Sequence, residues 1–279
     1  MTMNITPLHD THAIESVSFG VEWQQPLPPA VMGALESVYE AALKNELPSK
    51  KPVQQIAFEF NLESGGKSIQ PAHAVGWTFE RFAPDGRIER NLMLTPNTLA
   101  VTLHTYTRWE EVYATAADLM HPLLPLIAVS SGGFTVFGLQ YQDIFRITGD
   151  DVAQFRANML LRQNSAMLPA SVFQQKSLWH AHHGYFTEMP DEPERRKLTV
   201  VNTDLIDENG NRQVRILSVH KTLFNAPLSD TEQLYAGDNP PLHAAMHGMH
   251  SENKAVLREL LNDDMLARIH LNAEEGTDS

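Results

Sequence analysis

The residues of this chain whose type and spacing could support chemistry are histidines. The sequence contains 13 of them, and three, His243, His247 and His250, recur at helical spacing within the segment 242–260, LHAAMHGMHSENKAVLREL. Neutral imidazole is a common metal ligand, and histidine titrates near neutral pH. The segment could therefore hold a metal ion, relay protons, or form a packing helix that carries histidines at its edge.

Helical geometry limits the metal-binding interpretation. His243 and His250 are seven residues apart, which is about 10.5 Å along a helix axis at about 1.5 Å per residue. Zinc–nitrogen bonds are about 2.1 Å long, so these two side chains can hardly bind one ion. Only a neighbouring pair, His243 with His247 or His247 with His250, could share a metal, and a third ligand must come from elsewhere in the chain.

The segment 179–186, WHAHHGYF, could supply that ligand. It is predicted to be a strand, in which alternate residues face the same side, so His180 and His182 share a face. The candidate ligands for a divalent metal are therefore His180, His182, His243 and His247, and we expect no other cofactor. The alternative is a polar ladder on the strand and edge-of-core histidines on the helix. The zinc-peptidase pattern His-Glu-x-x-His is absent from the sequence.

On a helical wheel, the predicted terminal helix has a continuous apolar face. The residues on that face are Leu242, Met246, Met249, Val256, Leu257 and Leu260. Asn253 lies inside the face, and the three histidines lie along its edge. These positions predict a helix that packs on a sheet, with Asn253 satisfying a buried backbone group and His250 bordering the buried surface.

Composition narrows the classes of function. The chain has 279 residues, with 21 basic and 34 acidic residues and a formal net charge of −13. Its basic residues do not cluster, which argues against nucleic-acid binding, whereas an acidic surface suits a basic protein partner. The absence of cysteine excludes disulfides, thiolate zinc sites and a cysteine nucleophile. We find no signal peptide and no apolar run of membrane-spanning length, so we expect a cytoplasmic protein.

Alternating apolar and polar residues predict the fold class. Two strong hairpin signals lie at Pro84-Asp85-Gly86 and at Glu208-Asn209-Gly210, where glycine supplies a positive φ. Strands joined by tight hairpins are antiparallel. The prediction is an α+β fold, a large and mostly antiparallel meandering sheet with helices packed on one face.

Three helices are expected, at residues 30–45, 107–124 and about 240–270. Thr107 and Glu110 fit a capping box at the start of the second helix.

We predict an N-terminal α+β lobe at residues 1–148, a C-terminal lobe of β-hairpins and helix at 149–270, and a frayed tail at 271–279. Two related lobes that share one sheet are compatible with this order, although no sequence repeat supports them.

Four segments of the chain occur in an order that resembles a known family. They are AIESVSFGVEW, LMLTPNTLAVTLHTYTRWEEV, FTVFGLQYQDIFRI and LHAAMHGMHSENKAVLRELLNDDM. Together they resemble a sporadically distributed family of uncharacterised bacterial proteins of about this size. Its marks are Tyr106 and Trp109, which open a helix after a strand, and His250 in the terminal helix. Seven positions after His250 stands Leu257, where we expect an aromatic residue in the family.

The resemblance implies mobile genes in toxin–antitoxin or phage-defence neighbourhoods, and it supplies no catalytic residues. Our leading hypothesis is a non-catalytic protein-interaction module, antitoxin-like or defence-associated, that binds a basic protein or a second copy of itself. The alternative is a metal-assisted hydrolase or nuclease that uses the His180/His182 and His243/His247 pairs. A structure that brings the two pairs together around an open pocket favours the enzyme.

Overall fold

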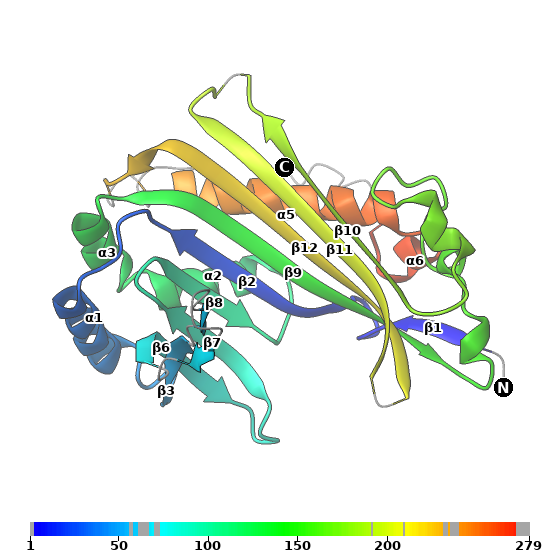
Figure 1. Ribbon diagram of the computed structural model, residues 1–279, viewed down its shortest axis with the longest axis horizontal. Helices are drawn as coiled ribbons and strands as arrows, with labels where there is room; N and C mark the ends of the chain where they lie inside the picture. The colour runs from blue at the N-terminus through cyan, green and yellow to red at the C-terminus, as the bar shows by residue number, and fades with distance from the viewer. Residues whose placement is uncertain are drawn as a thin grey trace. The chain divides into compact units, whose positions relative to one another are not determined.

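The computed structural model describes residues 3–55, 58–60, 67–69, 73–190, 192–208, 210–230, 234 and 240–271. It is an α+β fold, which confirms the predicted class (Figure 1). The strands are β1 (Asn4–Pro7), β2 (Ile14–Glu22), β3 (Ser49–Gln55), β4 (Phe58–Phe60), β5 (Lys67–Ile69), β6 (His73–Phe82), β7 (Ile88–Leu94), β8 (Thr98–Leu103), β9 (Phe134–Thr148), β10 (Trp179–Glu188), β11 (Arg195–Glu208) and β12 (Asn211–Leu228). The helices are α1 (Pro29–Ala42), α2 (Trp109–Met120), α3 (Leu124–Ser131), α5 (Pro241–Leu260) and α6 (Asp263–Arg268), with short 3-10 helices η1 (Val152–Gln154), η2 (Ala157–Met159) and η3 (Ala170–Gln174).

Ten of the strands form one sheet. Their order is β10-β11-β12-β9-β2-β8-β7-β6-β3, and β1 pairs with β9, while β4 and β5 form a separate two-stranded sheet. Every pair whose register is described is antiparallel. Both predicted hairpins are present: Gly86 has a φ of 84°, and Glu208 pairs with Asn211 beside Gly210 at a φ of 80°. Asn209 lies outside the described residues.

The chain divides into two compact units, and the division falls within β2, β9 and β12. Unit 1 comprises residues 1–18, 137–225 and 233–279, and unit 2 comprises residues 19–136 and 226–232. Both units are discontinuous in sequence. The lobes at 1–148 and 149–270 are a different division of the chain and stay a prediction. Of the predicted tail, residues 272–279 lie outside the described residues.

Unit 1 packs helix α5 along one face of β9, β11 and β12 (Figure 1). The six residues of the predicted apolar face of the helix, and Asn253 among them, are all buried. The helix ends earlier than predicted. Leu261 is extended, with a φ of −86° and a ψ of 149°, and it bridges to Leu161. Asn262 then caps α6, because its side chain accepts from Met265 N at 3.0 Å.

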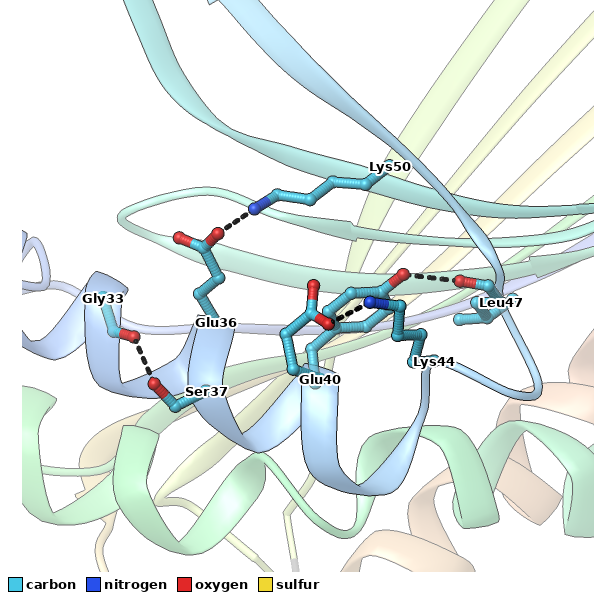
Figure 2. Close-up of polar contacts among 8 residues, drawn as sticks. Gly33, Glu36, Ser37, Glu40, Lys44, Leu47 and Lys50 are labelled. Atoms are coloured by element: carbon cyan, nitrogen blue, oxygen red, sulfur yellow. Dashed lines mark hydrogen bonds and ion pairs between the residues drawn. The ribbon is translucent and has the colours of Figure 1, made fainter.

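Unit 2 packs helix α1 against its part of the sheet. The ring of Tyr39 stacks on Phe79, with 3.8 Å between the centroids, and the Tyr39 hydroxyl donates to Leu47 O at 2.7 Å. The exposed side of α1 carries ion pairs, shown in Figure 2, that include Lys44 with Glu40 at 2.5 Å. The helix starts without a side-chain cap, and Pro29 occupies its first turn, where a missing N–H has no cost.

Helices α2 and α3 differ from the prediction. The residue before α2 is Arg108, which provides no side-chain cap, and Thr107 donates instead to the Glu111 carboxylate at 2.7 Å. The prediction of a capping box at Thr107 and Glu110 is therefore wrong. Helix α3 was not predicted, and it ends at Gly132, which has a φ of 79°. Within the described residues no single helix is long and apolar enough to cross a membrane; α2 and α3 meet that criterion only when taken together across a 59° bend.

We expect the substitution Gly133→Ala to destabilise the fold. Gly133 has a φ of 108°, and an added Cβ lies 2.7 Å from the backbone of Leu228. Strain of this kind costs on the order of 1–3 kcal/mol, which urea unfolding can measure. Gly33→Ala is the matched control, because the added Cβ there meets nothing within 4 Å. Alanine in the middle of a helix is more stable than glycine by up to about 1 kcal/mol. Equal stability of the two variants contradicts the prediction.

Candidate functional site: histidines of the terminal helix and the edge strand

Helix α5 separates its three histidines into two environments. His250 is buried, and its Nδ1 lies 2.8 Å from the hydroxyl of Tyr141 on β9. His243 and His247 are half-buried, and 4.0 Å separates their ring centroids. The three side chains therefore do not converge on one point, which agrees with the limit set by helical rise.

The two histidines of β10 lie on an exposed strand. His180 and His182 share a face of β10, with 5.4 Å between their ring centroids. His182 Nε2 is 3.4 Å from Asp204 Oδ1 on β11. Both histidines line an open pocket with a cavity volume of about 580 Å³, whose lining residues come from 178–182 and 204–208. Helix α5 contributes none of that lining.

The structure does not bring the two predicted pairs together as a ligand set. Among the described residues, no group of three histidine, aspartate or glutamate side chains could hold a metal ion. A catalytic zinc ion commonly has three protein ligands. The assignment of His180, His182, His243 and His247 to a metal stays a prediction that this geometry does not support.

A buried hydrogen-bond network beneath α5 contains Asn253, the second buried polar residue of the helix after His250. Asn253 Oδ1 lies 3.3 Å from His220 Nε2 on β12, and His220 Nδ1 lies 3.4 Å from the Thr199 hydroxyl on β11. A neutral ring that donates from Nε2 and accepts at Nδ1 satisfies both contacts. We call Thr199, Tyr141, His220, His250 and Asn253 the polar seam. Asn253 thus meets a histidine side chain, whereas the sequence predicted a backbone group.

Burial disfavours the charged form of His220. Burial lowers the pKa of His220 below its ordinary value of 6.5, and Lys197 acts in the same direction, while the contacts with Asn253 and Glu252 act against it. Glu252 Oε2 lies 3.8 Å from His220 Nδ1 and pairs with Lys197 at its other oxygen. Since the unfolded chain takes up a proton at a higher pH than the folded chain, stability is lost as the pH falls from about 6.5 through the lowered pKa.

Asp143 is a buried carboxyl group on the same strand as Tyr141. It is 1% exposed, and its Oδ2 has no hydrogen-bond partner among the residues that the structure describes. Burial raises the pKa of Asp143 to about 7. The hydroxyls of Thr203 and Ser218 are also buried without a hydrogen-bond partner in the described part of the chain. The layer under α5 therefore contains polar groups beyond those that the polar seam satisfies.

Sequence reasoning missed His220, Tyr141 and Asp143. The signal was present in β12, where Ser218, His220 and Thr222 occupy inward positions between apolar residues. Polar residues at inward positions of a strand predict buried hydrogen bonds to whatever covers that face.

Tyr106 and Trp109, which carried part of the family resemblance, belong to unit 2. Trp109 is buried and stacks on Tyr113, with 5.6 Å between the centroids, and it also contacts Phe19. Tyr106 is half-buried. Trp109 therefore acts as a core residue in this structure.

No family model and no curated protein matches the chain. The family resemblance therefore stays an expectation from the sequence.

We expect Asp143→Asn to stabilise the protein above pH 7. The folded chain holds the Asp143 proton up to about pH 7, whereas the unfolded chain releases it near 3.8. The free energy of unfolding therefore falls as the pH rises through this window. At about 1.4 kcal/mol per pKa unit, the gain from asparagine is at most about 4 kcal/mol at pH 8 and vanishes near pH 4. Urea unfolding at the two pH values measures it.

The exposed Asp118→Asn serves as the control and is expected to change stability by less than about 0.5 kcal/mol at both pH values. A gain from Asp143→Asn that does not depend on pH shows that the carboxyl group is not protonated in the folded state.

Proposed function

We propose that the chain is a non-catalytic protein-interaction module whose strand β10 binds an extended segment of a basic partner protein. The observation that carries this proposal is the position of β10. It ends the strand order of the sheet, pairs with β11 over all ten of its residues, and exposes seven of them. No described strand pairs with its outer edge. Such an edge presents backbone N–H and C=O groups that an added strand can complete.

The side chains of β10 suit a partner strand. Phe186 is 59% exposed, and it lies opposite Leu198, which is half-exposed on β11. A large exposed aromatic on a sheet edge offers apolar area that binding can bury. Glu188 and Glu194 are exposed where β10 ends and its loop follows. The net charge of −13 favours a partner segment that carries lysine or arginine, whereas the local charge is mixed, because Arg196 lies opposite Glu188 and over the ring of Phe186.

The enzyme hypothesis receives less support. A metal-assisted hydrolase or nuclease needs the β10 and α5 histidine pairs around one pocket, and the pocket beside His180 and His182 has no lining from α5. The resemblance to proteins of mobile loci supports a protein partner, such as a toxin or another defence component, encoded nearby. An antitoxin-like or defence-associated role is thus part of the proposal.

A library of random twelve-residue peptides displayed on phage tests the edge strand directly. We expect the selected peptides to be basic and rich in β-branched residues, and to slow amide hydrogen exchange in β10. Phe186→Lys is expected to weaken their binding about tenfold, because burying a phenylalanine contributes about 1.5–3 kcal/mol and the added charge repels a basic segment.

Phe82→Lys is the matched control. Phe82 is also a large exposed aromatic residue, at 40% exposure, and Lys51 lies over its ring. It differs from Phe186 in that it lies on β6, an inner strand of the sheet. This variant is expected to bind as the native chain does. Peptides that protect another segment from exchange, or that bind both variants equally, contradict the proposed function.

A further inference from the structure

A larger pocket lies at the end of unit 1 where the β11–β12 hairpin meets the end of β9. Its cavity volume is about 710 Å³, and its lining includes residues of both hairpin strands, of β9, and of η1. Pockets of about 300–1,000 Å³ are the usual size for small-molecule sites. The pocket depends on neither the outer edge of β10 nor any metal ligand.

Three arginines line this pocket: Arg146 on β9, and Arg212 and Arg215 on β12. Arg212 Nη1 donates to Val152 O at 3.1 Å, which joins the hairpin to η1. Arg215 Nη2 lies 3.1 Å from Glu208 Oε1. The guanidinium of Arg146 is exposed and has no ion-pair partner within the described part of the chain.

The acidic residues of the lining are already engaged. Glu15 accepts a hydrogen bond from Gln142, and Glu208 pairs with Arg215. Outside the lining, Asp207 accepts from Gly210 N at 3.1 Å and lies 3.7 Å from Arg212. These contacts use one carboxylate oxygen of Glu15, one of Glu208 and both of Asp207.

Donors therefore exceed acceptors in the pocket. Each guanidinium has five N–H donors, and the contacts above use one or two for each of Arg212 and Arg215. The lining contains three arginines and two glutamates, and Arg146 is the one of the three arginines for which the described residues provide no ion-pair partner. A surplus of fixed donors in a cavity favours an acceptor-rich, negatively charged ligand.

We propose that this pocket binds a small organic phosphate. A phosphate group offers several acceptor oxygens to guanidinium groups that approach from different strands, and arginine is the side chain that best matches this geometry. Arg146 supplies a guanidinium group that has no ion-pair partner among the described residues. Arg212 and Arg215 are held in place by Val152 and Glu208. The organic part of the ligand occupies the remaining volume beside Ile144 and Val152.

Calorimetric titration of the full chain with adenosine monophosphate and with inorganic phosphate, in a low-salt buffer free of other polyvalent anions, tests this site. We expect saturable binding at one site per chain, weakened by added salt. Arg146→Gln is expected to weaken binding at least tenfold, and Arg146→Lys to weaken it less. Arg146 is the residue to change because its exposed side chain makes no described contact that the fold requires.

Arg87→Gln removes the same charge from the β6–β7 hairpin, where Arg87 is 83% exposed, and is expected to leave the affinity unchanged. No saturable binding of either compound at millimolar concentration overturns the proposal. An equal loss of affinity in the Arg87 and Arg146 variants also overturns it, because it shows that only overall charge matters.

Discussion

The buried polar side chains of α5 meet hydrogen-bond partners on the sheet, and these contacts fix how the helix docks in unit 1. A buried donor or acceptor without a partner costs about 1–3 kcal/mol, which is a large share of the stability of a typical domain. His250 and Asn253 lie three residues apart on the helix, yet they meet side chains of two different strands, Tyr141 on β9 and His220 on β12. A shift of the helix by one residue breaks both contacts. The apolar face of α5 supplies most of the favourable burial, and the polar seam fixes the register in which that face docks.

The strands that α5 covers and the edge strand β10 differ in exposure. The face of β9, β11 and β12 under α5 has alternating buried positions, which in β11 and β12 occupy the central part of the strand, whereas β10 is exposed over most of its residues. An edge of this kind is a liability unless it is covered or used, because it can pair with any extended chain. The proposed function assigns it a use, and the arginine-lined pocket lies apart from that edge, at the hairpin end of β11 and β12.

Residue periodicity along the chain predicted more of the fold than of the candidate site. The apolar face of the terminal helix and the hairpin at Gly86 follow from residue spacing alone, because each depends on neighbours within one or two turns. The break at Leu261 depends on pairing with Leu161, which is far away in sequence. The helix α3 was missed because its apolar residues have no polar face to set a period. Pro125 lies in its first turn, where a missing N–H has no cost.

The prediction of the candidate site was limited in the same way. The sequence placed Asn253 and His250 correctly at the buried surface of the helix, but their partners His220 and Tyr141 are 33 and 109 residues away. Which inward polar residue meets which helix residue depends on strand order, and strand order is not encoded in spacing. For the same reason, the spacing within each histidine pair does not say whether the two pairs lie together.

The contact between the first and last described elements has a consequence for how the protein is made. Arg268 of α6 donates to Ile5 O at 2.7 Å, across 263 residues, and β1 pairs with the end of β9. Helix α5 and α6 leave the ribosome after every strand that they cover. During translation the inner face of β9, β11 and β12, with His220 and Asp143 in it, therefore stays open to water and to other chains. Unit 1 must close after synthesis of residue 268, so the nascent chain passes through a stage that favours chaperone binding.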